Sequence, residues 1–307
     1  MRENKFRIAI LVATYNGEKY IEEQIKSLQK QTVSNINIII NDDMSNDKTF
    51  SKLKQFVEKD SRIKISQVKC GGACENFLYL MRENRDYDWF FFCDQDDVWH
   101  PQKVEILINA VSAQSQTMPL LAYCDKEIVD ENLKFLNIED YDFQDEFKNI
   151  LFQNHIYGCA MMINKALTDK LLCLSNIAMH DHGAALIAVL EGKIIHVRKK
   201  LVKYRQHANN VTGGINQFSY KRKILHWNEV NRNQMKTFQM CRKICDLYKD
   251  KSNVAKMYLR MLDSNKYMRV VRAIKYGFRR NGFLPTLRAY LVMMQYNKLV
   301  DYFYDRT

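Results

Sequence analysis

Glycine and proline are scarce in this sequence, since its 307 residues include 10 glycines and 3 prolines. Folds made of many short antiparallel strands need frequent turns built from these residues. The composition therefore argues against a β-sandwich and favours helices with a parallel sheet. Apolar residues make up 47% of the chain and aromatic residues 12%, which excludes a disordered protein. The length allows one large domain, or one domain with an extension.

Long apolar runs and phosphate-binding glycine motifs are also absent. No stretch of 18 apolar residues occurs, and the apolar segment 8–13 is too short for a secretory signal, so we expect neither a membrane span nor a leader. Neither the P-loop motif nor the glycine motif of dinucleotide-binding folds follows the first predicted strand. Both of these nucleotide-binding folds therefore lose support.

The eight cysteines do not show the spacing of a disulfide framework. Two pairs, Cys70/Cys74 and Cys241/Cys245, are each separated by three residues, and the others stand singly, mostly among apolar residues. We therefore expect buried, reduced thiols in a cytosolic protein. A zinc site built from the two pairs is the minor alternative.

Acidic residues are few in the second half of the chain. Residues 1–150 contain 19 Lys and Arg against 26 Asp and Glu, a net charge of −7. Residues 151–307 contain 28 against 9, a net charge of +19, and the two halves together give +12. This asymmetry suggests that the second half faces an anionic surface or ligand.

Predicted strands and amphipathic helices alternate along the first hundred residues. This alternation is typical of a doubly wound sheet with right-handed crossovers. Short apolar runs predict strands at 7–13, 36–40, 63–68 and 89–93, and helical spacing predicts helices at 18–30, 49–59 and 73–84. Further strands are predicted at 120–123, 156–163, 194–197 and 201–204, with a hairpin and loop in the acidic segment 125–146 and helices at 165–174 and 184–190.

Three carboxylates follow the fourth predicted strand: Asp94, Asp96 and Asp97. Like charges this close raise one another's pKa unless a cation neutralises them. Carboxylate oxygens suit Mg²⁺ or Mn²⁺, and open α/β sheets bind ligands at the carboxyl ends of their strands. The same stretch could instead be an acidic turn, with Asp97 capping a helix that begins near Pro101.

Polar loops also follow the first two predicted strands, at 14–17 and 42–47. If the strands are neighbours, these loops share one rim with the acidic stretch and could bind a nucleotide. Asp42 and Asp43 could instead only cap the next helix. Asp181 stands between two histidines where a helix is predicted to begin, and could cap that helix or accept a proton.

Six motifs in this order and spacing resemble the inverting, nucleotide-sugar-dependent glycosyltransferases of family 2, which have the GT-A fold. The resemblance covers about residues 6–215 and is greatest to the bacterial rhamnosyltransferase-type branch. It implies an α/β fold with a GT-A doubly wound mixed sheet in 1–216. The residues after it, 217–307, are predicted from their own charge and spacing to form a basic helical extension. The motifs are Ala-Thr-Tyr-Asn-Gly (13–17), Asn-Asp-Asp-Met-Ser-Asn-Asp (41–47), Cys-Asp-Gln-Asp-Asp-Val-Trp (93–99), Gly-Cys (158–159), His-Asp-His (180–182) and Tyr-Arg-Gln-His-Ala-Asn-Asn (204–210).

The resemblance implies a nucleotide-sugar site on the loops after the strands. Asp42 matches the carboxylate that reads the base. The other matching positions are Ala13, Thr14, Tyr15 and Asn16 in the first nucleotide-binding loop, Gly72 and Asn76 in the nucleotide pocket, and Asp94, Gln95 and Asp97 around the donor sugar.

The resemblance also implies which residues carry the chemistry. Asp94 and Asp96 match the two ends of the D-x-D motif, and Asp96 is the closer match to the metal ligand. His207 matches the residue that closes over metal and diphosphate, and Asp181 matches the catalytic base. On the acceptor side stand Trp99, His180 and His182. The sequence departs from the usual pattern at His182, where related chains have tryptophan, and at Ala208, where they often have glycine.

The implied activity is the transfer of a sugar, with inversion, to a glycan or lipid-linked acceptor in the synthesis of bacterial capsule, cell wall or O-antigen. A divalent cation, Mn²⁺ or Mg²⁺, would act as Lewis acid, and one carboxylate base is enough for inversion. The first expected donor is dTDP-rhamnose, and transfer from a UDP-hexose or of galactofuranose is the alternative.

Two other functions fit the sequence less well than sugar transfer. A nucleotidyltransferase needs a glycine-rich phosphate loop with a basic residue after the first strand, and residues 14–17 supply neither. A basic nucleic-acid-binding module is the non-enzymatic alternative. The sequence contains no recognisable nucleic-acid motif and its first half is acidic, so we expect no nucleic-acid partner.

The C-terminal segment is basic and amphipathic. Residues 217–307 contain 20 Lys and Arg and 6 Asp and Glu, a net charge of +14. We expect it to attach a cytoplasmic enzyme peripherally to the anionic inner face of the plasma membrane. Alternatively, its apolar stripes pack onto the catalytic domain or form a homo-oligomer. The predicted apolar positions are Val270, Ile274, Phe278, Leu284, Leu287, Leu291 and Met294, and the predicted basic stripe is Arg269, Arg272, Lys275 and Arg279.

Overall fold

The computed structural model describes residues 6–138, 144–207 and 227–296. The domain boundary predicted at 216/217 and the departure at Ala208 lie outside these residues. Within them, no helix is long and apolar enough to span a bilayer.

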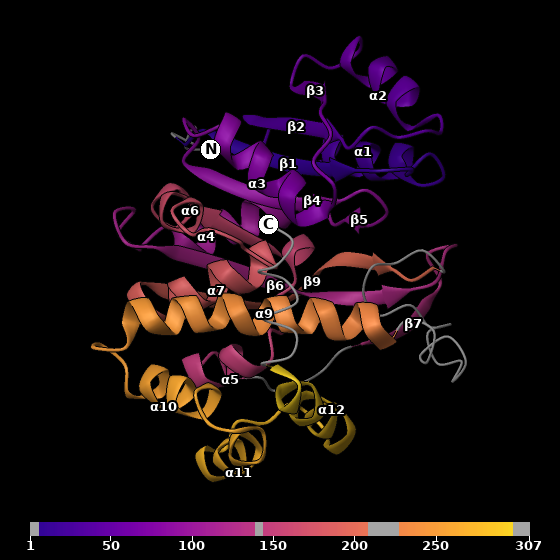
Figure 1. The fold of residues 1–307 in the computed structure, drawn as a ribbon. Coiled ribbons are helices and arrows are strands. Elements are labelled where there is room, and N and C mark those ends of the chain that lie inside the picture. The colour runs from indigo at the N-terminus through magenta and orange to yellow at the C-terminus, as the bar shows by residue number, and fades with distance from the viewer. Residues whose placement is uncertain (1–5, 139–143, 208–226, 297–307) are drawn as a thin grey trace.

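A mixed sheet lies at the centre of the molecule, in the order β3-β2-β1-β4-β8-β6-β9-β5, with β7 paired to β6 (Figure 1). The first four strands pair in parallel, and β8 runs antiparallel to both β4 and β6. The strands are β1 Ile8–Thr14, β2 Ile36–Asp42, β3 Ile63–Gln67, β4 Trp89–Asp94, β5 Val98–Trp99, β6 Leu120–Val129, β7 Phe135–Ile138, β8 Met161–Asn164 and β9 Lys193–Arg205.

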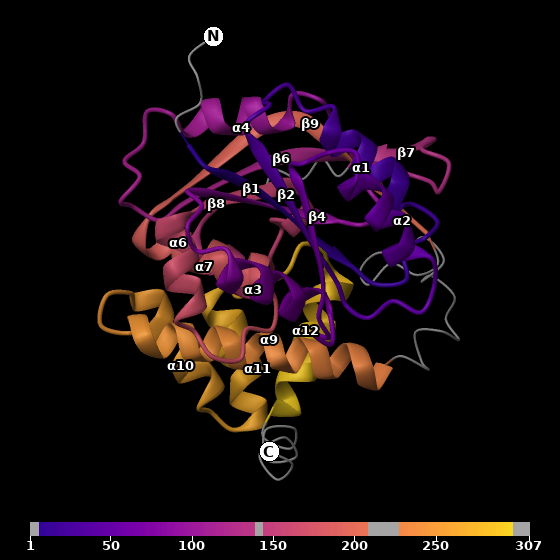
Figure 2. The ribbon, with the colours of Figure 1, turned by 90° about the horizontal axis from the view of Figure 1, so that it is seen from above.

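Helices cover both faces of this sheet (Figure 2). Helices α1, α2 and α4 lie on one face, and α3, α6 and α7 lie on the other, with the C-terminal helices stacked outside them. The helices are α1 Ile21–Gln29, α2 Thr49–Val57, α3 Ala73–Glu83, α4 Lys103–Val111, α5 Phe147–Phe152, α6 Lys165–Leu172, α7 His180–Glu191, α9 Trp227–Tyr248, α10 Asn253–Leu262, α11 Lys266–Tyr276 and α12 Phe283–Met294, with a 3₁₀ turn at Gly158–Ala160.

Strand β1 shows why the sequence favours this arrangement. All seven of its residues are buried, because helices cover both faces of the sheet. Ile8 and Ile10 pack on the side of α1 and α4, whereas Ala9 and Leu11 pack on the side of α3 and α7. A continuous apolar run is therefore what a central strand needs here.

Two predicted strand boundaries are wrong. The segment predicted as a strand at 156–163 begins with the 3₁₀ turn, because Gly158 packs against the ring of His180, where a Cβ would lie 2.7 Å from Nε2. The strands predicted at 194–197 and 201–204 are one long strand, β9, whose register to β6 shifts around Asp125. The hairpin predicted in the acidic segment is present as β6 and β7.

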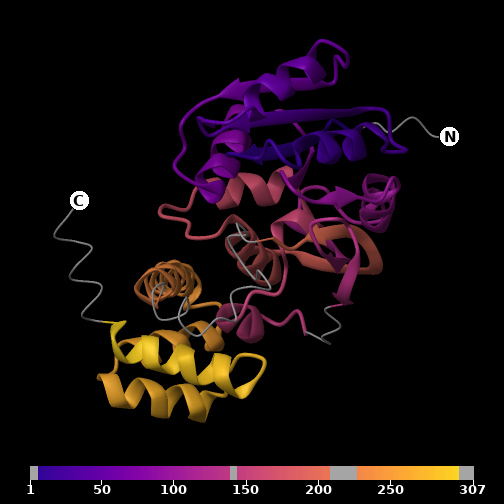
Figure 3. The same ribbon diagram turned by 90° about the vertical axis from the view of Figure 1, so that its right-hand side faces the viewer.

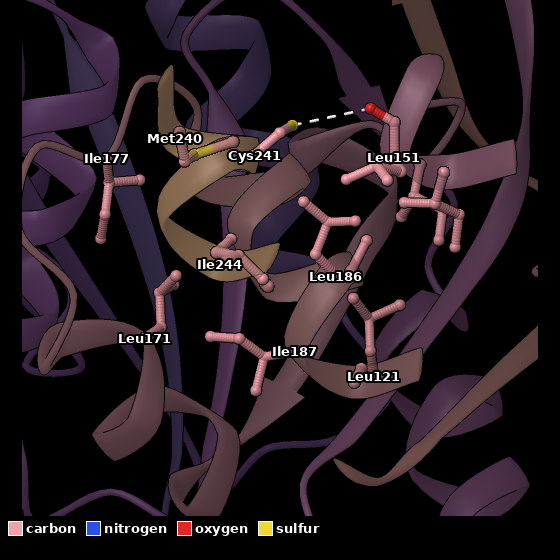
Figure 4. Packing of buried hydrophobic residues seen from close by; sticks show 14 of the residues in the cluster. Leu121, Leu151, Leu171, Ile177, Leu186, Ile187, Met240, Cys241 and Ile244 are labelled. Atoms are coloured by element: carbon pink, nitrogen blue, oxygen red, sulfur yellow. Dashed lines mark hydrogen bonds between the residues drawn. The ribbon is translucent and has the colours of Figure 1, made fainter. Parts of the chain in front are cut away.

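The C-terminal helices share an apolar core with the rest of the chain. Cys241 of α9 donates its S–H to the carbonyl oxygen of Leu151 at 3.6 Å, and Ile244 packs in the same cluster as Leu186 of α7 (Figure 4). Tyr258 and Phe278 are buried in this cluster too. Helices α9 to α12 are therefore part of one packed body.

None of the eight cysteines is in a disulfide, and five of them are buried. Cys241 and Cys245 stand in the apolar core, where burial raises the pKa of Cys241 to about 12. These surroundings suit neutral thiols, so the zinc alternative finds no support at this pair.

Candidate active site

The carboxyl ends of β1, β2 and β4 meet at one edge of the sheet. In the strand register Thr14 of β1 lies opposite Asp42 of β2, and Ala13 lies opposite Asp94 of β4. The three polar loops therefore form one rim, as the sequence predicts. Ala13 and Thr14 are themselves buried at this edge.

The first loop is fastened to the acidic loop by Gln95. The Tyr15 N–H donates to Gln95 Oε1 at 2.8 Å, and Gln95 Nε2 donates to the Tyr15 carbonyl oxygen at 2.9 Å. A Cβ on Gly17 would lie 2.3 Å from Gln95 Oε1, so a larger residue there would displace the Gln95 side chain. The Tyr15 side chain is 52% exposed and free to meet a ligand.

Asn16 fixes the other side of this loop. Its φ of 49° is left-handed, a conformation that asparagine tolerates better than most residues. Its N–H donates to Ser45 Oγ at 2.8 Å, and its Oδ1 accepts from the Asn46 N–H at 2.9 Å. Asn16 thereby joins the loops after β1 and β2.

The Asp42 carboxylate is buried and already accepts several hydrogen bonds. Oδ1 accepts from Thr14 Oγ1 at 3.0 Å and from Ser45 Oγ at 2.5 Å. Oδ2 accepts from the Ser45 N–H at 2.9 Å and from Gln67 Nε2 at 3.0 Å. A nucleotide base would share this carboxylate with donors that hold the loop in shape.

Asp43, which the motif comparison did not single out, organises the loop before α3. Its two oxygens accept from the N–H groups of Cys70, Gly71 and Gly72, at 2.5–3.0 Å. Gly72 has a φ of 145°, which few other residues adopt, and stands just before α3. Asn76 is buried and exchanges hydrogen bonds with Asn41, so it supports the pocket wall.

The acidic loop after β4 gathers two carboxylates around the thiol of Cys159. Ligand atoms of Asp94, Asp97 and Cys159 all lie within 4.8 Å of one another. Burial, together with the nearby charges of Asp96 and Asp181, raises the pKa of Asp94 to about 7. Burial also raises the pKa of Asp97 and of the Cys159 thiol well above their usual ranges.

This arrangement fits a divalent cation. Asp97 Oδ1 accepts from the Arg205 N–H at 3.0 Å, whereas its buried Oδ2 has no nitrogen or oxygen donor in the described part of the chain. The Cys159 thiol lies beside Asp97, and a cation would be a stronger partner for this carboxylate. Two carboxylates are hard ligands of the kind that Mg²⁺ and Mn²⁺ prefer. Asp94 and Asp97 are thus the two carboxylates that could hold such a cation.

Asp96 points to His207 instead. His207 Nε2 lies 2.8 Å from Asp96 Oδ2, and the imidazole stacks on the Tyr20 ring with centroids 4.9 Å apart. The structure therefore brings together two of the three predicted metal ligands, Asp96 and His207, at the mouth of the site. Tyr20 is a further contact that the sequence did not reveal.

Arg205 holds the acidic loop in place, a role that sequence reasoning missed. Its side chain is buried, and Nε donates to the Asp96 carbonyl oxygen at 2.7 Å. Another nitrogen, Nη2, donates to Glu23 Oε2 at 2.6 Å, and Nη1 donates to the Glu131 carbonyl oxygen. The sequence contains one indication of this role, which is that Arg205 stands at the end of a predicted strand, two residues before His207.

Lys103 supplies a buried positive charge beneath the loop. Its Nζ donates to the Cys159 carbonyl oxygen at 2.5 Å and lies 3.2 Å from the centroid of the Trp99 ring. Its charge lowers the pKa of Asp94, against the larger effect of burial. Trp99 is 2% exposed and packs in the core, so its predicted place on the acceptor side does not fit this structure.

Asp181 stands in the first turn of α7, where it is 8% exposed. Burial raises its pKa to about 6, although N–H groups of His182 and Gly158 stabilise the charged form. The His182 N–H donates to Asp181 Oδ1 at 2.6 Å, a bond that also satisfies the start of the helix. The negative charge of Asp181 contributes to the raised pKa of Asp94.

The two histidines beside Asp181 face the core. The His180 ring packs between Phe77 and Phe92, with centroids 4.5 and 4.9 Å away, and burial lowers its pKa to about 3. His182 Nε2 donates to the Ile150 carbonyl oxygen at 2.7 Å, and burial lowers its pKa to about 4. Their predicted acceptor-side positions therefore do not fit, because both rings are packed in the interior.

Comparisons with known proteins identify the family of this chain. The profile of glycosyl transferase family 2 matches residues 9–171. The dTDP-rhamnosyl transferase RfbG of Shigella flexneri is 32% identical over 234 residues, which span 70% of this chain and 78% of that protein. The Escherichia coli protein WfgD, a UDP-Glc:alpha-D-GlcNAc-diphosphoundecaprenol beta-1,3-glucosyltransferase, is 29% identical over 52% of this chain and 60% of its own length.

Solved structures show the same fold at low sequence identity. Residues 1–349 of S. aureus TarS in complex with UDP-GlcNAc align with a TM-score of 0.57 and 14% identity, over 95% of this chain and 92% of that one. The Pyrobaculum calidifontis mannosyltransferase PcManGT, in complex with GDP-Man and Mn²⁺, aligns with a TM-score of 0.53 and 14% identity, over 98% and 88%. The chain therefore has the GT-A fold and belongs to glycosyl transferase family 2.

Proposed function

We propose that this protein is a metal-dependent inverting glycosyltransferase that moves rhamnose from dTDP-rhamnose to a glycan or lipid-linked acceptor in bacterial surface polysaccharide synthesis. The observation that carries the chemistry is the grouping of Asp94 and Asp97 after β4, together with the effect of the Asp181 charge on the pKa of Asp94. The donor is proposed from the similarity to a dTDP-rhamnosyl transferase over most of that protein's length.

Asp181 is the proposed base. Its pKa of about 6 leaves the carboxylate charged at neutral pH, yet basic enough to take the proton from an acceptor hydroxyl. One such carboxylate is enough for inversion, because the acceptor attacks the face of the sugar opposite the leaving group. The short bond from the His182 N–H keeps Asp181 Oδ1 in a fixed orientation.

Asp94 and Asp97 would hold a divalent cation, Mn²⁺ or Mg²⁺, with Asp96 and His207 at the mouth of the same site. When bound, the cation would neutralise the charge that develops on the leaving nucleoside diphosphate. The protein's own part is to keep the carboxylates in position. Arg205 does so through its N–H bond to Asp97, and Lys103 adds a nearby positive charge.

A donor panel tests this proposal. Purified protein is incubated with Mn²⁺ and dTDP-, UDP- or GDP-linked sugars, and release of the nucleotide is measured with Asp181→Asn as the matched control. We expect release from dTDP-rhamnose that stops in EDTA. Preference for a GDP-sugar would contradict the proposed donor.

Transfer from a UDP-hexose or of galactofuranose is the second candidate. The similarity to WfgD, which covers about half of this chain, favours a UDP-hexose, because WfgD is named as a UDP-Glc glucosyltransferase. Release of UDP in place of dTDP in the same panel would select it.

We also propose that the enzyme works in the cytoplasm, attached peripherally to the inner face of the plasma membrane. The net charge of +14 in residues 217–307 supports this attachment. A homo-oligomer formed through the C-terminal helices is the alternative.

A further inference from the structure

Helices α11 and α12 expose an unusual number of large apolar side chains. Of the 14 large apolar side chains that are exposed in the described residues, eight belong to these two helices. Phe283 and Leu284, at the start of α12, are 78% and 73% exposed. We call the set Tyr267, Val271, Ile274, Phe283, Leu284 and Leu287 the α11–α12 surface.

These side chains face outward because other residues of the same helices face inward. On α11, Arg269 and Ala273 are buried, and the Arg269 guanidinium donates to the carbonyl oxygens of Leu262 and Met293 at 2.9 and 3.2 Å. The prediction that Arg269 belongs to an exposed basic stripe is therefore wrong. Tyr267, Val271 and Ile274 recur at helical spacing on the opposite, exposed side.

The prediction that the apolar stripes pack onto the catalytic domain is thus only partly right. Phe278 is buried in the common core, whereas Ile274 is 62% exposed, and Leu287 and Leu291 are 42% and 44% exposed. Contiguous apolar side chains on a surface usually mark a binding face, because water disfavours them.

The charge around the α11–α12 surface has one sign. The sequence from Ser264 to Tyr296 contains seven Lys and Arg and no Asp or Glu. Lys266, Lys275 and Arg279 are exposed at the two ends of α11 and in the turn that leads to α12. A second copy of this chain would bring the same positive charge, whereas an anionic bilayer would bring the opposite one.

We infer that the α11–α12 surface docks onto an anionic lipid bilayer. Phe283 and Leu284 would enter the boundary between head groups and acyl chains, while Lys275 and Arg279 would meet lipid phosphates. Both helices lie at the end of the molecule opposite β3 and α2, so the docking face leaves the nucleotide-binding half free (Figures 1 and 3). The inference rests on the proposed peripheral attachment, but it does not depend on the donor sugar.

Vesicle binding by the full chain tests the inference. Vesicles of phosphatidylcholine, with or without phosphatidylglycerol, are sedimented with the protein at low and high salt. We expect binding that requires phosphatidylglycerol and is weakened by salt. Phe283→Ser/Leu284→Ser should weaken binding about tenfold or more, since both side chains leave the interface. Substitutions are preferable to removing the helices, because α9 to α12 share the core.

Two matched controls separate this face from the rest of the surface. Leu247→Ser removes a side chain that is 65% exposed on α9, outside the α11–α12 surface, and should leave binding unchanged. Lys275→Gln/Arg279→Gln should weaken binding, whereas Lys59→Gln/Lys64→Gln, which changes exposed lysines near β3, should not. Circular dichroism checks that each variant is folded.

Three results would overturn the inference. In the first, the wild-type protein does not bind anionic vesicles at low salt. In the second, Phe283→Ser/Leu284→Ser binds them as well as the wild type does. In the third, light scattering would show that the wild-type protein is a dimer and that Phe283→Ser/Leu284→Ser dissociates it, while the variant still binds vesicles. That result would assign the surface to a second copy of the chain. Nucleotide release is measured separately, so failure of the proposed donor would not be mistaken for failure of this inference.

Discussion

Burial gives Asp181 a different role from the two histidines that flank it. It raises the pKa of Asp181 to about 6, and lowers the pKa of His180 to about 3 and of His182 to about 4. At neutral pH the site therefore contains a charged carboxylate beside two neutral rings that face the core. The two histidines are therefore poor candidates for the base, and the remaining question is whether Asp181 caps the helix or accepts a proton.

Asp181→Asn should abolish most of the transfer and leave donor binding intact. The amide keeps the shape and can still accept the His182 N–H, but it cannot take a proton. We expect turnover to fall about 10²–10⁴-fold, measured as nucleotide release in the presence of acceptor. Unchanged affinity for the donor nucleotide is the control. Near-normal turnover would show that Asp181 is not the base and only stabilises the start of the helix.

The pH dependence of turnover should report the same group. Because the pKa of Asp181 is raised to about 6, its basic form is present above that pH and is lost as the pH falls. Turnover at saturating donor and Mn²⁺ should therefore fall about tenfold per pH unit below pH 6. Asp181→Asn should remove this limb from its residual activity. A limb near pH 3 or 4 would point to the histidines instead.

Removing a carboxylate of the acidic loop should weaken metal binding. Asp94→Asn or Asp97→Asn is expected to raise the Mn²⁺ dissociation constant at least about tenfold in calorimetry, because each removes one ligand charge. Asp96→Ala should weaken donor binding and lower turnover, since it also removes the carboxylate beside His207 Nε2. Asp250→Asn, at an exposed position in the turn after α9, is the control. Full activity in EDTA would contradict metal dependence.

At the scale of elements, the site depends on how the end of β9 is fastened to the acidic loop. Arg205→Met should lower the free energy of unfolding by about 2–4 kcal/mol, because the carbonyl oxygens of Asp96 and Glu131 lose the donor that the buried Arg205 supplies. Urea unfolding measures the change. Lys203→Met, two residues earlier on the same strand but exposed, should stay within about 0.5 kcal/mol. Equal effects of the two substitutions would refute this role of Arg205.

Short sequence patterns predict those helices and strands that are determined by neighbouring residues. Strands β1 to β4, the helices between them and the shared rim follow from apolar runs and the polar residues after them. Contacts between distant residues do not follow from such patterns. The Arg205 N–H meets Asp97 across 108 positions, and Trp99 is buried because the two residues of β5 pair with β9.

The same limit explains the histidines. Helical spacing predicts that a helix begins near His180, but which side chains of its first turn face the core depends on where α7 packs. Phe77, Phe92 and the Ile150 carbonyl oxygen take up the two rings, and none of these contacts is visible in the motif. Asp181, between them, accepts the His182 N–H and affects the pKa of Asp94 through its charge.

At the scale of the whole molecule, one question is whether residues 1–216 and 217–307 unfold as separate units. The predicted boundary rests on a change of composition, whereas a single apolar cluster contains residues of β1, α3, α7 and α9 to α12. A shared core makes unfolding of one part costly for the other, because both lose apolar contacts. We therefore predict one cooperative transition.

A substitution in α9 tests this cooperativity. Phe238 is 1% exposed and packs against Phe152, so Phe238→Ala should lower the free energy of unfolding by about 3–5 kcal/mol. Fluorescence in a Trp227→Phe background follows the sheet through Trp89 and Trp99, and far-ultraviolet circular dichroism follows the helices. Both signals should shift together, since the core spans both regions. Leu247→Ala, exposed on the same helix, should move neither. If only the helical signal shifted, the C-terminal helices would be a separate unit, as their composition first suggests.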